Sequence, residues 1–260
     1  VEALAISFLN SYLDPAHEQA AAHELRRLLP DTFITTGTEL TREWHEFERT
    51  ATAAANAYVG PQVSRYIGEF DSQLRDGGFA GSLLLMGSHG GVISAERGCR
   101  EPITLVESGP VGGCIGAASY GGLLGIDNLV AFDMGGTTAK AGVIHRGEVL
   151  TTGAALVGGY AQALPVQIPM IDIFEVGTGG GSIASVDASG ALHVGPSSAG
   201  AEPGPACYAR GGALPTVTDA NLVLGRLGAD RFLGGEMKLD VAAAERAIRE
   251  HVCKPTGLPL

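Results

Sequence analysis

The stretch "LVAFDMGGTTAKAGVI", residues 129–144, constrains the fold of this chain more than any other feature. A run of apolar residues ends at Asp133, two glycines and two threonines follow, and a second, largely apolar run contains Lys140. Short apolar runs bounded by glycine and polar residues are typical of buried strands. We therefore expect a strand, a tight glycine turn and a second strand, with a carboxylate at the end of the first.

The turn between these strands has the composition of a phosphate-binding loop. Gly135 and Gly136 leave the backbone N–H groups uncovered, and consecutive N–H groups can form a concave nest for phosphate. Thr137 and Thr138 add two hydroxyl donors. Asp133 would repel a phosphate directly, but it can hold a Mg²⁺ ion that neutralises one. The competing interpretation is a glycine hairpin that carries a solvated aspartate.

The segment after the turn excludes a Walker A loop, which needs the pattern GxxxxGK[ST] and a helix behind it. Here a strand follows, then the turn "HRGE" and a further extended run. A strand, glycine turn and strand around phosphates is the arrangement found in the superfamily of actin and the sugar kinases. We therefore expect an α/β fold with a mixed sheet, flanking helices and glycine-rich hairpins.

A second glycine loop stands in "EVGTGGGSIASVDASGALHVG". It contains four glycines within five positions, followed by a serine: Gly177, Gly179, Gly180, Gly181 and Ser182. Bare backbone there can lie flat against the sugar or phosphates of a nucleotide, where a side chain would clash. The competing interpretation is a bulged turn before a hairpin whose own turn holds Gly190. Two such loops in one chain favour a nucleotide cleft.

A third glycine cluster, "SGPVGGCIGAA", is typical of a helix opened by Pro110. Each glycine costs a helix about 1 kcal/mol relative to alanine, so packing or binding must offset the loss. Gly112 and Gly113 lie near the helix N-terminus, where a phosphate can bind. Alternatively, the smooth face formed by Gly113, Ala117 and Gly121 packs closely on a sheet.

Helices and strands alternate in the rest of the pattern. Apolar spacing and capping residues predict helices over residues 14–30, 44–58, 216–228 and 239–252. The expected buried stripe of the second helix is Trp44, Phe47, Ala51, Ala54 and Tyr58. Gly60-Pro61 is expected to interrupt that helix, and Glu48 with Arg49 to form a solvated or interface pair on it. These elements suffice for one core, and no linker marks a domain boundary.

Composition excludes several kinds of function. The net charge is −11 without a cluster of Lys and Arg, which argues against nucleic acid as a partner. No apolar run reaches the ~20 residues that a membrane helix needs. The four cysteines lack CxxC spacing, so we expect reduced thiols in a cytoplasmic protein, with Cys114 and Cys207 buried and inert. Because a strand begins at Val1 without a charged leader, we expect a piece of a longer protein.

These segments together resemble the hydantoinase A/oxoprolinase family. The resemblance runs from about residue 10 to residue 240 and rests on "LDPAHE", "HEFERTATAAANAYVGP", "ESGPVGGCIGAA", "FDMGGTTAK", "VGTGGGSIASVDASGALHVGPSSAGAEPGPACYARGG" and "PTVTDANLVLGRL". The glycine–proline block over 195–212 is a long, unusual string. We expect it to be an ordered loop at an active site or interface.

The resemblance implies an actin-like ATPase (ribonuclease H-like) lobe that uses ATP and Mg²⁺ to phosphorylate an amide or ketone oxygen. It also implies a partner, the B-type hydantoinase subunit or domain. Family members carry a further phosphate loop in an N-terminal region, and nothing like it precedes residue 80 here. This piece is therefore expected to fold but not to turn over ATP by itself.

In this interpretation Asp133, Thr137 and Thr138 act at the reacting phosphate. Many family members end the loop with an acidic residue where this chain has Lys140. A cation there can pair with phosphate but cannot help to hold a metal ion. Asp133 is thus the best metal candidate, and Asp219 in "TVTDAN" is a weaker one.

The leading functional hypothesis is ATP-dependent hydrolysis of a cyclic amide, of hydantoin or 5-oxoproline type, by an A-type subunit. The first alternative is a subunit of an ATP-dependent ketone carboxylase, which would use the same loops. The second comes from another class: a nucleotide-gated binding module without a small-molecule substrate, like the chaperones and filament proteins of the same superfamily.

Overall fold

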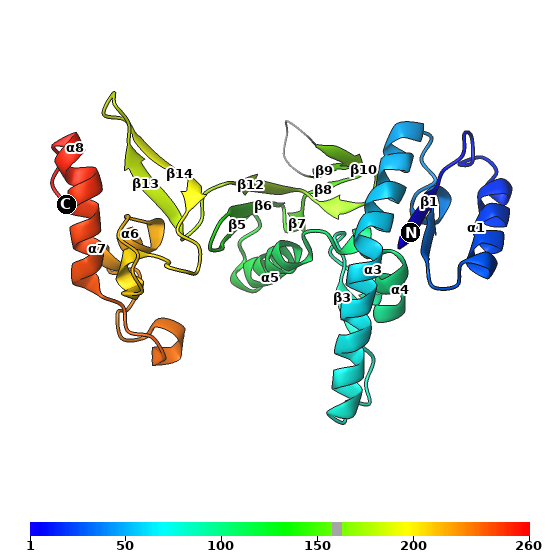
Figure 1. Cartoon of the computed structure of the whole chain (residues 1–260), viewed down its shortest axis with the longest axis horizontal. Helices are drawn as coiled ribbons and strands as arrows, with labels where there is room; N and C mark the ends of the chain where they lie inside the picture. The colour runs from blue at the N-terminus through cyan, green and yellow to red at the C-terminus, as the bar shows by residue number, and fades with distance from the viewer. Residues whose placement is uncertain (158–162) are drawn as a thin grey trace. The chain divides into compact units, whose positions relative to one another are not determined.

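The computed structural model of the chain describes residues 1–157 and 163–260 as a mixed α/β structure (Figure 1). It divides into two compact units: unit 1 comprises residues 1–131 and 142–173, and unit 2 comprises residues 132–141 and 174–260. Among the described residues, the buried apolar side chains of these units form several clusters. No helix among the described residues is both long and apolar enough to cross a membrane.

Unit 1 begins with a parallel pair of strands. β1 (Ala3–Ile6) pairs with β2 (Phe33–Thr36), and α1 (Ala16–Leu28) makes the crossover that parallel strands require. The other elements of this unit are α2 (Gly37–Leu40), α3 (Glu46–Asp76), the antiparallel pair β3 (Leu84–Met86) and β4 (Val92–Ser94), α4 (Ala95–Arg100), a 3-10 turn (Pro102–Leu105), α5 (Ser108–Leu124), β7 (Glu148–Val149), β8 (Thr151–Thr152), β9 (Ala155–Val157), β10 (Leu164–Val166) and β11 (Met170–Ile171). The antiparallel pairs β9–β10 and β8–β11 complete it.

The predicted strand, turn and strand around Asp133 are confirmed. β5 (Leu129–Met134) leads into the glycine turn and β6 (Ala139–His145) leads out of it. They belong to one sheet of order β12-β6-β5, where β12 is Ile173–Val176 and β7 also pairs with β6. The chain passes between the two units within β5, within β6 and at the start of β12, so the turn itself belongs to unit 2.

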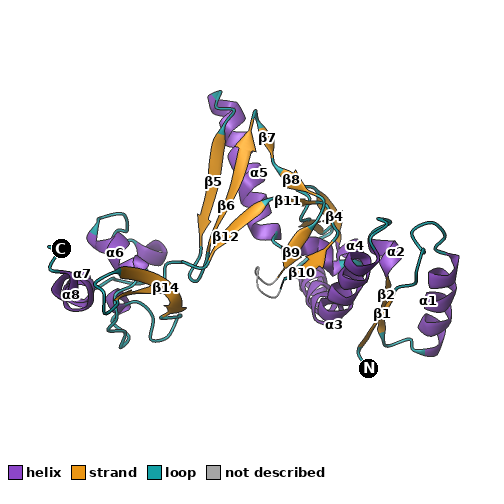
Figure 2. Ribbon diagram, turned by 90° about the horizontal axis from the view of Figure 1, so that it is seen from above, coloured by secondary structure: helices purple, strands orange, loops and turns teal. Residues whose placement is uncertain are grey.

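The hairpin and the two helices predicted for the C-terminal part of unit 2 are confirmed. The hairpin of β13 (Ser182–Val186) and β14 (Leu192–Ser198) turns at Gly190, whose φ is +84°. It is followed by α6 (Val217–Val223), α7 (Val241–Ile248), a π turn (Arg249–Cys253) and α8 (Lys254–Thr256), with 3-10 turns at Ala206–Tyr208 and Phe232–Gly235. Strand β13 of the hairpin packs against α6 and the π turn, and Figure 2 shows β14 near α6. Thr216 and Asp240 cap the two helices, as their sequence positions predict.

The long helix α3 continues through Pro61 for 31 residues, so the predicted interruption is wrong. Neighbouring elements hold both halves of the helix. Before the proline, the Asn56 amide donates to the Thr35 hydroxyl (3.0 Å); after it, the Ser64 hydroxyl donates to the Cys99 carbonyl (2.7 Å). Contacts on both sides thus offset the one helical hydrogen bond that a proline removes.

The buried face of α3 also differs from the predicted stripe. Trp44, Phe47 and Tyr58 are 64%, 69% and 88% exposed. Ala51 of the predicted stripe is buried as expected, and the side chains buried beside it are small or polar: Arg49, Thr52, Ala53, Asn56 and Ala57. The close approach of α3 to β2 explains why small side chains are buried, because a Cβ at Gly60 would lie 2.5 Å from the Phe33 ring of β2. A side chain from α3 does not fit at this point, because the Phe33 ring already lies there.

Arg49, expected on a solvated or interface face, is fully buried. Its guanidinium donates to the carbonyl oxygens of Phe8 (2.9 Å) and Glu43 (3.0 Å) and pairs with the carboxylate of Glu46. A buried charge is tolerated only when it is paired and hydrogen-bonded. The sequence pattern shows the charge of this residue but not these partners, which come from the loop after β1 and from residues 43–46.

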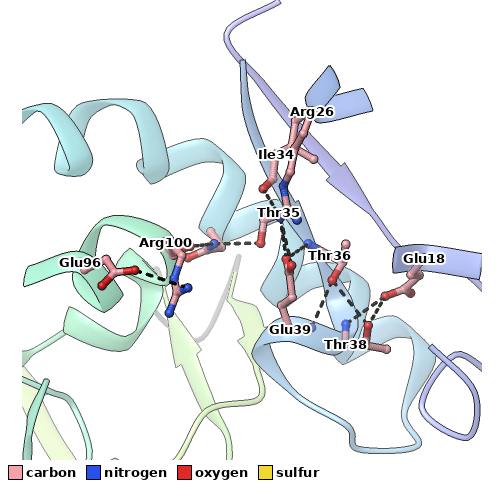
Figure 3. A network of polar contacts seen from close by, with 10 residues as sticks. Glu18, Arg26, Ile34, Thr35, Thr36, Thr38, Glu39, Glu96 and Arg100 are labelled. Carbon is pink, nitrogen blue, oxygen red and sulfur yellow. Dashed lines mark hydrogen bonds and ion pairs between the residues drawn. The ribbon is translucent and has the colours of Figure 1, made fainter. Parts of the chain in front are cut away.

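Glu18 of α1 is a second buried charge, and Figure 3 shows it beside Thr38. Its carboxylate accepts hydrogen bonds from the N–H of Phe8 (2.8 Å), the hydroxyl of Ser11 (2.6 Å), and the N–H (3.0 Å) and hydroxyl (2.7 Å) of Thr38. Burial by itself raises the pKa of Glu18, but these hydrogen bonds outweigh it and the pKa is lowered. The ionised form therefore ties α1 to α2.

We expect Glu18→Gln to lower the melting temperature (Tm) at pH 7, because the amide replaces a carboxylate that accepts four hydrogen bonds. A lowered folded-state pKa contributes stability above the unfolded value, near 4.5, and that contribution is lost as the pH falls through the folded-state pKa. The Tm difference from wild type should therefore shrink below pH 4.5. Circular dichroism melts over a pH series measure it, with the exposed Glu24→Gln on the same helix as control. A difference independent of pH would contradict this account.

Candidate functional site

Two glycine loops, which join β5 to β6 and β12 to β13, pack backbone to backbone in unit 2. The N–H of Gly180 donates to the carbonyl of Gly135 (2.9 Å), and the N–H of Gly181 donates to the carbonyl of Gly136 (2.7 Å). The first loop is also closed on itself, because the N–H of Gly135 donates to the carbonyl of Thr138 (2.9 Å). The structure thus brings together two glycine clusters that stand 40 residues or more apart in the sequence.

This pairing explains the run of glycines in the second loop. A Cβ at Gly179 would lie 2.5 Å from the backbone nitrogen of Thr137, and a Cβ at Gly181 would lie 3.0 Å from the carbonyl oxygen of Gly136. Real Cβ atoms do not approach backbone so closely, so the first loop itself requires bare backbone here. The predicted contact of this run with a nucleotide stays a prediction.

Several polar groups of the first loop make no hydrogen bond to the second loop. Within the described part of the chain, the N–H groups of Gly136 and Thr137 and the hydroxyls of Thr137 and Thr138 have no hydrogen-bond partner. The same holds for the carboxylate of Asp133, which is exposed at the end of β5. Adjacent N–H donors, two hydroxyls and one carboxylate within six successive residues have the composition of an anion and metal site.

Two predicted contact residues have partners inside the protein. Ser182 is 1% exposed, and its hydroxyl accepts a hydrogen bond from the N–H of Gly179 (2.9 Å), so it supports the second loop from within. Lys140 of β6 pairs with Glu175 of β12, with 3.8 Å between the ammonium nitrogen and a carboxylate oxygen. A salt bridge to a carboxylate therefore already compensates the charge of Lys140.

Asp219, the weaker metal candidate, is a structural residue, and that prediction is corrected. It is fully buried, and its carboxylate accepts hydrogen bonds from the N–H groups of Ala206 (3.2 Å), Cys207 (2.8 Å) and Thr216 (2.9 Å) and from the Thr216 hydroxyl (2.8 Å). It thereby fastens the glycine–proline loop to the start of α6. The signal in the sequence is the spacing T-x-x-D of a capping box. Among the described residues, no group of three or more His, Cys, Asp or Glu side chains is placed to hold a metal ion.

The two cysteines predicted to be inert are buried, Cys114 in unit 1 and Cys207 in unit 2. Burial raises the pKa of both thiols, and the neighbouring Asp219 carboxylate raises that of Cys207 further. Thiols of this kind are poor nucleophiles at neutral pH. Their role is packing: Cys207 belongs to the apolar cluster of unit 2 that also contains Leu222 and Ala244.

The third glycine cluster lies on α5, in unit 1. A Cβ at Gly121 would lie 2.7 Å from the carbonyl oxygen of Ile126, so this glycine serves close packing. A Cβ added at Gly113 would meet no described atom of another segment within 4 Å, so the packing interpretation does not extend to this glycine. The predicted contact of Gly112 and Gly113 with a phosphate stays a prediction.

A separate pocket of about 480 Å³ lies in unit 1, beside the residues of Figure 3. The charged side chains around it are paired with one another: Arg26 with Glu39 (3.0 Å), Arg97 with Glu101 (2.9 Å) and Arg100 with Glu96 (3.8 Å). Because these charges already compensate one another, the pocket offers a phosphate less than the glycine loops do. The paired loops of unit 2 are therefore the stronger candidate site.

The model of the Hydantoinase/oxoprolinase family matches residues 49–258. The chain belongs to this family. The matched range includes both glycine loops, the glycine–proline loop and α6, so the family pattern covers the whole candidate site. The resemblance inferred from the sequence motifs is confirmed.

Relatives named for two different reactions match nearly the whole chain. Caprolactamase subunit alpha of Pseudomonas jessenii is 38% identical over 99% of this chain and 36% of its own length. Acetophenone carboxylase gamma subunit of Aromatoleum aromaticum is 37% identical over 98% of this chain and 35% of its own. The crystal structure of ATP-dependent caprolactamase from Pseudomonas jessenii matches with a TM-score of 0.79 and 37% identity, over 99% of this chain and 37% of that one. The chain spans little more than a third of the length of these relatives.

We expect Gly179→Ala to destabilise the protein by about 1–3 kcal/mol, because the added methyl group forces the two loops apart. Gly177→Ala is the matched control in the same loop, since nothing described lies within 4 Å of its Cβ position. Urea denaturation followed by circular dichroism gives both free energies of unfolding. Equal effects of the two substitutions would contradict the pairing of the loops.

Proposed function

We propose that this chain is the nucleotide-phosphate-binding part of an ATP-dependent enzyme that hydrolyses a cyclic amide, of hydantoin or 5-oxoproline type. One observation carries the proposal: the second glycine loop binds the carbonyls of Gly135 and Gly136, while adjacent N–H groups, two hydroxyls and the Asp133 carboxylate of the first loop have no partner among the described residues. The actin-like form of the ATPase lobe is part of the same proposal. The similarity of nearly the whole chain to the structure of ATP-dependent caprolactamase supports the use of ATP.

The donors of the first loop fit Mg²⁺ with a nucleotide. Asp133 is the one carboxylate on that loop, and Mg²⁺ is commonly held by one or two carboxylates together with water and phosphate oxygens. Bound there, the ion would neutralise phosphate charge. Asp133 would hold it from the end of β5, while the N–H groups of Gly136 and Thr137 and the hydroxyl of Thr138 would orient phosphate oxygens. Lys140 would not bind the metal, and its pairing with Glu175 limits the charge that it could offer a phosphate.

ATP would supply what amide hydrolysis lacks, because an amide carbon is a weak electrophile and its nitrogen a poor leaving group. The amide oxygen attacks the γ-phosphorus and ADP leaves. A first water molecule would then add to the activated carbon, and the ring C–N bond would break with proton transfer to nitrogen, leaving an acyl phosphate. A second water molecule would hydrolyse this acyl phosphate to the carboxylate and free phosphate. The loop residues contribute by holding the phosphoryl group in line and compensating its charge, which is how proteins chiefly accelerate phosphoryl transfer.

The second candidate function is that of a ketone carboxylase subunit. The relative of this type, acetophenone carboxylase gamma subunit, matches at 37%, almost the 38% of the caprolactamase subunit. Similar identity to proteins named for different reactions supports assigning this segment to a step common to both. Activation of an oxygen atom by ATP is such a step.

Both relatives are named as subunits, which supports a partner subunit or domain of B type for this chain. We also propose a cytoplasmic location. The four cysteines are free thiols, as expected in a reducing compartment.

The function is tested with the full-length protein and its partner subunit. Phosphate release from Mg²⁺-ATP is measured with hydantoin, with 5-oxoproline, and with a ketone plus bicarbonate. We expect a cyclic amide to stimulate it, with one ring-opened product per phosphate. Stimulation by the ketone and bicarbonate would favour the carboxylase, and nucleotide binding without either response would favour the binding module.

We expect Asp133→Asn to lose most Mg²⁺-dependent ATP turnover, by about 100-fold or more, because the amide no longer compensates the charge of a metal ion. The Tm should stay within about 2 °C of wild type, since this exposed side chain has no described partner to lose. Asp76→Asn, at the exposed end of α3, is the matched control. Turnover near the wild-type rate would refute the role of Asp133.

A further inference from the structure

Thr218, in the first turn of α6, makes a double contact with the second glycine loop. Its backbone N–H and its hydroxyl both donate to the carbonyl oxygen of Gly180, each at 2.8 Å. Thr218 is only 9% exposed, so these bonds form largely away from water. Hydrogen bonds in such surroundings are electrostatically stronger than in solvent. The side chain therefore acts on one peptide group of the loop, between residues 180 and 181.

That peptide group passes the effect on to the first loop. Its N–H, which belongs to Gly181, donates to the carbonyl of Gly136 (2.7 Å). The Gly136 carbonyl in turn shares a planar peptide group with the N–H of Thr137. Two peptide groups in series thus connect Thr218 with the N–H of Thr137, which has no partner among the described residues.

We propose that Thr218 is a positioning residue for the phosphate loop, and that its hydroxyl strengthens the N–H of Thr137 as a donor to an anionic oxygen. Hydrogen bonds in series polarise one another, so a second donor on the Gly180 carbonyl increases the positive charge at the far N–H. Polarised donors bind charged oxygens more strongly. The proposal rests on the function proposed above, because the oxygen it concerns belongs to a nucleotide phosphate.

The relay is first tested without any ligand. Full-length protein labelled with ¹⁵N-threonine gives an amide signal for Thr137. Loss of the hydroxyl in Thr218→Val should move the amide proton of Thr137 upfield, and Thr218→Ser should leave it near the wild-type position. Thr256→Val is the matched control, because it also removes a hydroxyl that donates to a backbone carbonyl of unit 2, that of Val252 (2.7 Å). It should not move the signal.

Binding is then measured by calorimetric titration of the same proteins with Mg²⁺-ATP and with inorganic phosphate. Thr218→Val should weaken binding by about 3–10-fold, the loss expected for one weakened hydrogen bond. Thr218→Ser and Thr256→Val should bind like wild type. Should Thr218→Val not fold at the assay temperature, Thr218→Ala, which also lacks the hydroxyl, is measured in the cold.

The outcomes separate this proposal from the function on which it rests. Absence of nucleotide binding by the wild-type protein would refute the proposed function, whatever the Thr137 signal does. Nucleotide binding that Thr218→Val leaves unchanged, or weakens no more than Thr256→Val does, would overturn the role of Thr218. An unmoved Thr137 signal would overturn the relay. A weakened affinity restored by Thr218→Ser, at equal Tm, would support it.

Discussion

Two hydrogen bonds, from the N–H groups of Gly180 and Gly181 to the carbonyls of Gly135 and Gly136, hold the arrangement on which the candidate site depends. They direct the carbonyls of the first loop toward the second loop. Carbonyl oxygens that faced the site instead would repel an anion. The adjacent N–H groups and threonine hydroxyls are left for another partner. The two backbones can approach each other this closely because Gly179 has no side chain that would clash with the backbone of Thr137.

Buried polar groups fix much of the remaining structure. In unit 1 the carboxylate of Glu18 and the guanidinium of Arg49 bind backbone groups from several segments, and in unit 2 Asp219 fastens the glycine–proline loop to α6. Each of these charged side chains is fully buried and makes several hydrogen bonds. A charge that lost one such partner would be left in a medium of low dielectric constant, so these contacts specify one arrangement of the loops.

The match to the hydantoinase/oxoprolinase family includes both glycine loops. A lactam-cleaving and a ketone-carboxylating relative resemble this chain to almost the same degree, although their names describe different products. The feature that both could share is a place where phosphate is held and its charge compensated. In the proposed function the paired glycine loops supply the donors for that task, and the relatives' further length leaves room for groups that select the substrate.

The sequence by itself determined the strand–turn–strand around Asp133, the hairpin turn at Gly190, the capped helices near the C-terminus and the family, because glycine, capping residues and apolar spacing act through neighbours in the chain. Only the tertiary structure decided that α3 runs through Pro61 and buries Arg49 rather than its aromatic side chains, and that Asp219 holds backbone rather than metal. It alone paired the two glycine loops and placed Thr218 behind them. These outcomes depend on hydrogen-bond partners distant in sequence, and the types of residues along the chain do not reveal such partners.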